Sequence, residues 1–319
     1  MSLWFQTPEL NKSRSSALSI KLLFCCVSGD SVGFGHLSRC LALADQAASK
    51  KWEIEFLVFG DHLSRERVVE AGYACRLASI KDHTVASVPD PQAVNVVITD
   101  IAHPVFLSRQ EDAALWIHRF RSLAGVLAVI DSMGDHSMAS RFPNMSANLL
   151  VVPYVSSDNL PKGTWRVLSG PKYAVLSSAY HDLPQGSQQR NEADRILVTC
   201  GGSDSTKLTE VILEGLEQIQ KLLKIHVIEG PLFGDSLRKC LKQKAEQSRH
   251  RITLLDAPES LAEHMLWCDL AISNSGLTKY ELAATGTPAL LVSIDEFHDR
   301  VNRDFSARGS VCDLGVDVT

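Results

Sequence analysis

The 319-residue sequence has no excess of positive charge and no long apolar run. Its 32 lysines and arginines are outnumbered by 37 aspartates and glutamates, which gives a net charge of -5. Proteins that bind nucleic acid need clustered basic residues, so we expect no nucleic-acid partner. A helix that spans a membrane needs about 20 consecutive apolar residues, and no segment reaches that length. We therefore expect no membrane span.

The eight cysteines lack the spacing of a zinc or redox motif, because none of them forms a C-x-x-C pair. Most lie in apolar runs, where free thiols serve as small hydrophobic side chains in a reducing compartment. The cysteine pattern therefore predicts a cytoplasmic protein. Asp131, Asp135 and His136 could imitate a metal-ligand group, but an acidic turn after a strand is the preferred interpretation.

From Ile20 onward, short aliphatic runs alternate with segments of helical period, which is typical of parallel strands joined by helices. Strands are expected at 20–27, 54–59, 94–99, 126–130 and 149–152, and again at 196–199, 225–228, 252–255, 270–272 and 289–292. A polar leader over 1–19 is left out of the fold. A polar linker over 184–194 separates a first domain, 20–183, from a second, 195–319. The predicted fold class is α/β, with two doubly wound, Rossmann-like domains and a ligand cleft between them.

The first candidate site is the loop Gly33-Phe34-Gly35-His36, between the first strand and its helix. The glycines allow close backbone approach, and His36 stands at the positive end of the helix, which favours a neutral imidazole. Such a side chain could take a proton from water or from an acceptor hydroxyl. A structural role in capping or packing is the alternative. A nicotinamide site is disfavoured, because Ser38 replaces the third glycine of the G-x-G-x-x-G pattern.

Two loops of the second domain could bind an anion. Gly201-Gly202-Ser203-Asp204 offers backbone amides before a helix, without the spacing of a P-loop. A second helix begins after Ser275, and its amides could hold a diphosphate while Glu281 accepts hydrogen bonds from a ribose. Ordinary glycine turns and a solvated Glu281 are the simpler alternatives.

These loops resemble those of the UDP-2,4-diacetamido-2,4,6-trideoxy-β-L-altropyranose hydrolases of pseudaminic acid biosynthesis. The similar segments are 33–39, 41–44, 170–176, 201–204 and 272–288. The nucleotide half also looks like that of the glycosyltransferase that adds N-acetylglucosamine to the peptidoglycan lipid precursor. The resemblance implies a GT-B-like fold that binds UDP. Related chains continue into C-terminal helices, which we expect to be missing from this sequence.

The resemblance also implies roles for individual residues. His36 would be the general base that activates water for attack at the anomeric carbon, expelling UDP with inversion. Amides near the glycines would bind the diphosphate, the strand end at Leu255-Asp256 would face uracil, and Glu281 would hold the ribose. The residues expected to contact the substrate are Gly33, Gly35, Arg39, Gly202, Ser203, Leu255, Asp256, Asn274, Ser275, Gly276, Leu277 and Glu281. No metal and no cofactor are implied, because helix amides can stabilise the departing diphosphate, and a monomer is expected.

The half that would face the sugar departs from the hydrolase pattern. Asp100-Ile-Ala-His103 stands where Asp-His-Tyr is usual, Asp131-Ser132 replaces paired aspartates, and Pro153-Tyr154 replaces an Asn-rich segment. The leading prediction is a UDP-sugar hydrolase that releases a free amino-sugar for nonulosonic acid synthesis. Two alternatives stay open: a GT-B glycosyltransferase that uses a UDP-sugar donor, and a non-catalytic protein that binds a sugar nucleotide.

Overall fold

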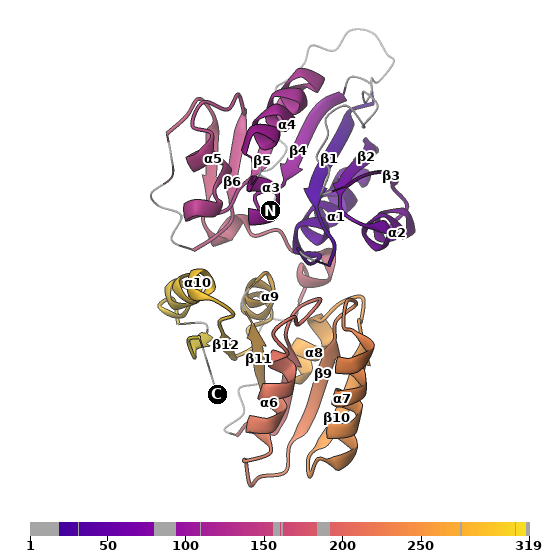
Figure 1. Ribbon diagram of the computed structural model, residues 1–319, viewed down its shortest axis with the longest axis vertical. Helices are drawn as coiled ribbons and strands as arrows, with labels where there is room; N and C mark the ends of the chain where they lie inside the picture. The colour runs from indigo at the N-terminus through magenta and orange to yellow at the C-terminus, as the bar shows by residue number, and fades with distance from the viewer. Residues whose placement is uncertain are drawn as a thin grey trace.

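The computed structural model describes residues 19–30, 32–79, 94–108, 110–155, 160, 162–183, 192–274, 276–309 and 311–316. The predicted leader up to residue 18, most of the predicted linker and Ser275 lie outside the described residues. Two parallel sheets, each covered by helices, form two domains that lie one above the other in Figure 1.

In the described part of the first domain, seven parallel strands pair in the order β3-β2-β1-β4-β5-β6-β7. The strands are β1 Lys21–Val27, β2 Glu53–Phe59, β3 Ala74–Ala78, β4 Val94–Asp100, β5 Ala124–Ile130, β6 Leu149–Val152 and β7 Arg166–Ser169. The helices are α1 Gly35–Ala48, α2 His62–Glu70, α3 Pro104–Leu107, α4 Gln110–Leu123 and α5 Met138–Arg141. The strand order reverses direction between β1 and β4, which is where doubly wound sheets open a ligand crevice.

The central strand β1 is apolar from Leu22 to Val27 because both of its faces are covered. Leu23 and Cys25 belong to the core cluster that contains Trp116 of α4. Phe24, on the opposite face, belongs to the cluster that contains Leu37 of α1. Since successive side chains of a strand point to opposite faces, one continuous apolar run serves two cores. This packing fixes where β1 ends and where the loop to α1 begins.

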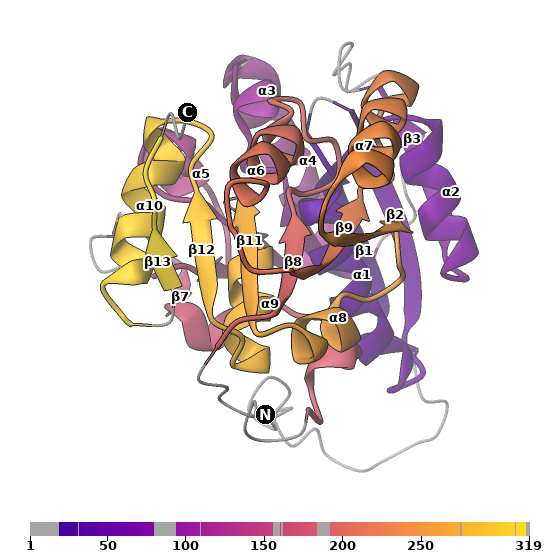
Figure 2. The ribbon, with the colours of Figure 1, turned by 90° about the horizontal axis from the view of Figure 1, so that it is seen from below.

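The described residues of the second domain repeat this design with the strand order β10-β9-β8-β11-β12-β13, again all parallel. Its strands are β8 Arg195–Thr199, β9 Lys224–Glu229, β10 Arg251–Asp256, β11 Leu270–Asn274, β12 Ala289–Val292 and β13 Val311–Asp313. Its helices are α6 Leu208–Leu216, α7 Asp235–Gln247, α8 Ala262–Trp267, α9 Thr278–Thr285 and α10 Glu296–Ser306. Figure 2 shows the strands of this sheet side by side between α10 and α7.

The structure confirms the predicted fold class of two doubly wound α/β domains. Three short strands, β3, β7 and β13, were not expected from the sequence; all three lie at sheet edges, where half-exposed residues weaken the apolar pattern.

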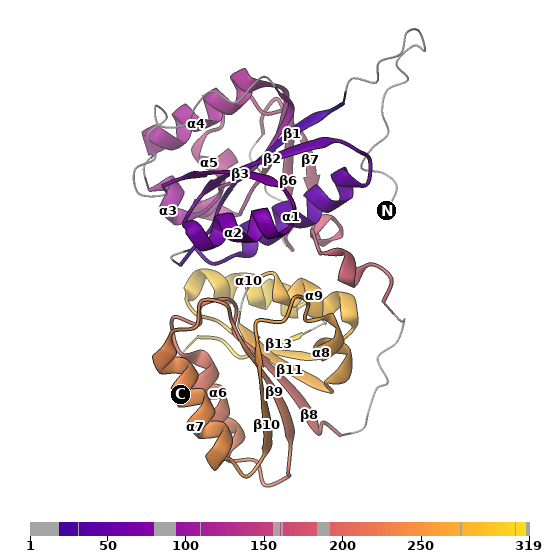
Figure 3. The same cartoon turned by 90° about the vertical axis from the view of Figure 1, so that its right-hand side faces the viewer.

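The chain crosses between the domains after β7 (Figure 3), and Leu176, Tyr180 and Leu183 pack against the core of the second domain. This stretch therefore packs with the second domain, although the sequence analysis places it in the first. No helix in the described ranges has the length and apolarity needed to cross a bilayer.

Candidate functional site

A cavity of about 810 Å³ lies where the carboxyl ends of the two sheets face each other. In the first domain it is lined by the loops after β1, β4, β5 and β6, and in the second by the loops after β8, β9, β10, β11 and β12. Its volume lies within the usual range for small-molecule sites, roughly 300–1,000 Å³. The cavity is therefore the interdomain cleft that the sequence predicts.

The cavity brings together most of the residues singled out from the sequence. The lining includes Gly33, Gly35, His36, Arg39, Gly202, Ser203, Asn274, Gly276, Leu277 and Glu281. Leu255 and Asp256 do not line it: Leu255 packs against a core cluster, and the Asp256 carboxylate pairs with Arg238 Nη1 at 2.8 Å. The residues that line the cavity at this strand end are 257–259, one step further along the chain.

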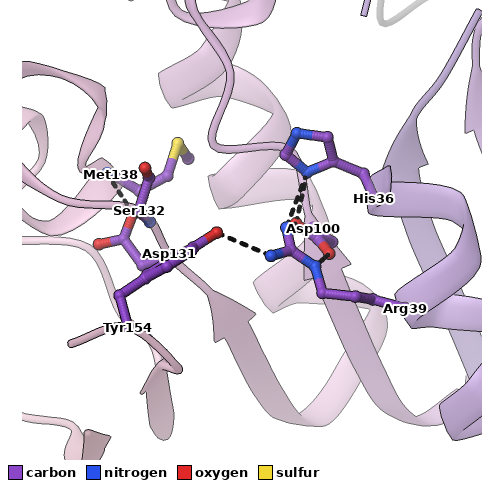
Figure 4. A network of polar contacts seen from close by, with 7 residues as sticks. All are labelled: His36, Arg39, Asp100, Asp131, Ser132, Met138 and Tyr154. Carbon is purple, nitrogen blue, oxygen red and sulfur yellow. Dashed lines mark hydrogen bonds and ion pairs between the residues drawn. The ribbon is translucent and has the colours of Figure 1, made fainter. Parts of the chain in front are cut away.

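His36 belongs to a buried polar network that connects α1 to the end of β4 (Figure 4). Its Nδ1 lies 2.6 Å from Asp100 Oδ1, and Asp100 is fully buried. Arg39 donates to both oxygens of the same carboxylate at 2.8 Å, and its Nη1 donates to the Tyr154 hydroxyl at 2.7 Å. Burial alone would raise the pKa of Asp100, but Arg39 and His36 hold it below its usual value. The carboxylate is therefore ionised and bound to two donors.

This geometry fixes the tautomer of His36. The short contact between Nδ1 and the Asp100 carboxylate requires a proton on Nδ1, since two acceptors would repel at that distance. Arg39 Nη2 also lies 3.1 Å from Nδ1, but it donates to Asp100, its closer and charged partner, at 2.8 Å. In neutral His36 the lone pair is consequently on Nε2, where it can accept a proton.

A second imidazole, His103, lies beside the first with the opposite tautomer. The ring centroids are 5.7 Å apart at 90°, and His103 Nδ1 accepts a hydrogen bond from the Val105 amide at 3.2 Å. Its proton is therefore on Nε2, which makes that nitrogen a donor. Burial, together with neighbouring histidines, lowers the pKa of His103 to about 4, so the ring stays neutral at physiological pH. The sequence analysis noted His103 only as a departure from a family pattern.

The glycine loops of the two domains meet across the cleft. A Cβ on Gly35 would lie 3.7 Å from Leu277 Cδ1, and one on Gly202 would lie 3.8 Å from Phe34 Cδ2. The helices that begin here, α1 and α9, have no side-chain hydrogen bond at their N-caps. Two helix N-termini with uncapped amides thus approach one another, which favours an anion between them.

The glycine loop after β8 is shaped by close backbone packing. Gly201 has φ +81°, and a Cβ on Gly230 would lie 2.4 Å from the Gly202 carbonyl oxygen, so glycine is required at both positions. Asp204 does not face an anion freely, because its carboxylate accepts hydrogen bonds from the amides of residues 208 and 209 at the start of α6. The usable amides are therefore those of the preceding residues. Asn274 Oδ1, beside this loop, is a buried acceptor that has no hydrogen-bond partner among the described residues.

Glu281 lies one turn into α9 and lines the cavity. Burial raises its pKa to about 7, although a hydrogen bond with the Tyr180 hydroxyl opposes the shift. A raised pKa and a half-buried position exclude the simple alternative of a solvated surface carboxylate. Tyr180 comes from the segment that crosses between the domains, and no sequence pattern indicated its place in the site.

Asp131 has a structural role. Its carboxylate accepts hydrogen bonds from the amides of Ser132, Met138 and Ala139 and from the Ser137 hydroxyl, at 2.6–2.9 Å. The interpretation of this stretch as an acidic turn is consistent with that geometry. In the portion of the chain that is described, no group of three or more metal-ligating side chains is found.

The fold is that of the GT-B glycosyltransferases. MurG from Acinetobacter baumannii superposes with a TM-score of 0.61 at 16% identity, covering 93% of this chain and 86% of that one. HepE from Anabaena, solved in complex with UDP-glucose, superposes with a TM-score of 0.52 at 13% identity, covering 91% of each chain.

Sequence comparison finds a family match in the second domain. Residues 195–304 match the glycosyltransferase family 28 C-terminal domain. An uncharacterised protein of Methanocaldococcus jannaschii is 24% identical over 86% of this chain and 56% of its own length, and the spore coat polysaccharide biosynthesis protein SpsG of Bacillus subtilis is 23% identical over 49% and 45%. This chain therefore spans about half the length of these two relatives.

A third relative is named as an N-acetylglucosamine transferase. The UDP-N-acetylglucosamine–N-acetylmuramyl-(pentapeptide) pyrophosphoryl-undecaprenol N-acetylglucosamine transferase of Histophilus somni is 27% identical over 81% of this chain and 74% of its length. These relatives support the resemblance to the transferase more than the resemblance to the hydrolases. The hydrolase family stays a prediction.

Proposed function

We propose that the cleft binds a UDP-sugar and that the protein transfers the sugar to an acceptor hydroxyl. The observation that carries this proposal is the pairing of His36 with the buried Asp100 directly opposite the N-terminus of α9. The first domain thereby contributes a base, and the second an anion site, to one cavity. The named transferase relative and the structure of HepE with UDP-glucose support the choice of donor.

In this mechanism His36 Nε2 accepts the proton of the attacking hydroxyl while the anomeric carbon–oxygen bond to UDP breaks. Asp100 keeps Nδ1 protonated and stabilises the imidazolium that forms. The negative charge that develops on the departing diphosphate is met by the amides at Gly202 and at the start of α9. Attack from the side opposite the leaving group inverts the anomeric centre.

Hydrolysis is the second candidate, since the same base could activate water. It was the leading prediction from the sequence, and the neighbouring tautomers of His36 and His103 suit it: His36 accepts a proton from the water while His103 donates a hydrogen bond to its oxygen. The two candidates differ in whether turnover needs an acceptor.

The test measures UDP release from a panel of UDP-sugars in oxygen-18 water, with and without candidate sugar acceptors. Transfer predicts acceptor-dependent UDP release and a glycosylated product, whereas hydrolysis predicts labelled free sugar without any acceptor. His36→Asn should retain UDP binding and lose turnover by about 10²-fold or more. His62→Asn, a histidine exposed on α2, is the matched control and should be unchanged. Wild-type protein that binds no UDP would refute the donor assignment.

A further inference from the structure

Arg67 of α2 is a cation in the cleft without an assigned role. It lines the cavity with its side chain partly buried. Its guanidinium carbon lies 4.2 Å from the centre of the Phe34 ring, within the range of a cation–π contact. Phe34 is itself buried at the start of α1, so the ring is a fixed platform for the guanidinium.

The guanidinium has no ion-pair partner among the residues that the structure describes. Glu70, one turn along α2, attracts it only at longer range, and burial lowers the pKa of Arg67 without neutralising it. A partly desolvated cation without a paired anion is an unfavourable arrangement that a cation–π contact offsets only in part. The position therefore favours an anionic ligand.

The other arginine and the lysine of the described lining, Arg39 and Lys279, already donate to protein groups. Arg39 is bound to Asp100 and Tyr154, and Lys279 Nζ donates to Asn302 Oδ1 at 3.0 Å. For the Arg67 guanidinium, by contrast, the described residues provide only the cation–π contact with Phe34 and no hydrogen-bond or ion-pair partner.

Arg67 also lies close to the anion loop of the second domain. A Cβ on Gly202 would lie 3.8 Å from Cδ2 of the platform residue Phe34. Leu232, whose amide donates to the Gly202 carbonyl, packs against the cluster that contains Phe34. Phe34 therefore lies near both Arg67 and the loop after β8.

We propose that Arg67 binds the β-phosphate of the nucleotide, an inference that rests on the proposed function. Two N–H groups of its planar guanidinium donate to non-bridging oxygens of the phosphate held at Gly202, opposite the amides of α9. The first domain thereby contributes a cation to the leaving group, and the bound diphosphate ties α2 to the second domain.

The test compares the binding of UDP, UMP and uridine to the full chain by calorimetry. Arg67→Met, which keeps the apolar stem, should weaken UDP binding about 10- to 100-fold and leave uridine and UMP unchanged within about threefold. Arg67→Lys, which keeps the charge but not the paired donors, should lie between Arg67→Met and wild type. Arg65→Met, an exposed position on the same helix, is the matched control and should bind all three ligands like wild type.

Unaltered UDP binding by Arg67→Met would overturn this inference while leaving the proposed function intact. An equal loss of UDP and uridine binding would also overturn it, because it would show a general effect on the cleft. If the wild-type chain itself binds no UDP, the proposed function fails and the role of Arg67 fails with it. Thermal unfolding of each variant shows whether the fold is retained.

Discussion

The buried network around Asp100 gives a prediction that does not depend on the identity of any substrate. Replacing Asp100 by asparagine removes a charge that Arg39 and His36 share inside the first domain. Asparagine has the same shape but places an N–H donor where one of these donors must be accepted, and it leaves the buried Arg39 without a counter-charge.

The magnitude follows from the burial of the pair. Breaking a buried ion pair by removing one partner costs about 3–5 kcal/mol. Because asparagine keeps one acceptor oxygen, we expect the lower end for Asp100→Asn, about 3 kcal/mol, against a total stability of about 5–15 kcal/mol for a domain. Asp45→Asn, which removes an exposed carboxylate that accepts from Tyr73, should change stability by less than about 0.5 kcal/mol.

The assay is hydrogen exchange of the β1 and β4 amides in increasing urea, which follows the first domain separately from the second. Because the pKa of Asp100 is lowered in the folded protein, its stabilising contribution is complete above about pH 4 and is lost as the pH falls through the folded-state pKa. Asp100→Asn should remove that part of the acid sensitivity. A loss below about 1 kcal/mol at pH 7 would refute the view that this ion pair holds β4 to α1.

Nitrogen-15 NMR should show neutral His36 protonated on Nδ1 and His103 protonated on Nε2. If both histidines had the same tautomer, the hydrogen bond of His36 to Asp100 or that of His103 from the Val105 amide would be contradicted. The pKa of Glu281 is raised to about 7, so the folded protein binds this proton more tightly than the unfolded chain does. The stabilisation that the bound proton provides is present at pH 4 and is lost as the pH rises through 7. Glu281→Gln should therefore be more stable than wild type by about 1–3 kcal/mol at pH 8, and an unchanged urea midpoint would count against the shift. Gly230→Ala should destabilise the second domain by about 1–3 kcal/mol in the same urea titration, because its Cβ would meet the backbone of 201–202. Gly215→Ala, inside α6, is the control: its Cβ meets no atom within 4 Å, so it should not destabilise the domain, and equal effects would exclude the backbone contact as the cause.

The strand pattern was legible in the sequence because buried parallel strands are continuous apolar runs. The run from Leu22 to Val27 in β1 has this character, and its side chains are divided between two core clusters. Edge strands such as β7, with the sequence RVLS, bury too little to differ from a loop. The packing of Leu176 to Leu183 against the second domain could not be predicted either, because no local sequence pattern shows which core an apolar side chain joins.

The site was only partly predictable for a related reason. Glycine turns before helices are local features, so the loops at Gly33 and Gly202 could be found from the sequence. Arg67 could not, since its place in the cleft depends on how α2 packs beside the second domain. Asp256 was expected to face uracil, but it does not line the cavity, and its carboxylate pairs with Arg238 of α7.

The pairing of His36 with Asp100 shows what a single sequence can and cannot provide. His36 and Arg39 are three residues apart on α1, so the sequence alone places both side chains on one face of a helix. Their shared acceptor is 64 residues from His36 and becomes a neighbour only because β4 pairs with β1, which brings Asp100 beside Cys26. The structure buries Arg39, and a buried guanidinium needs a counter-charge. The strand order then decides which carboxylate it is, and with it the tautomer of the base.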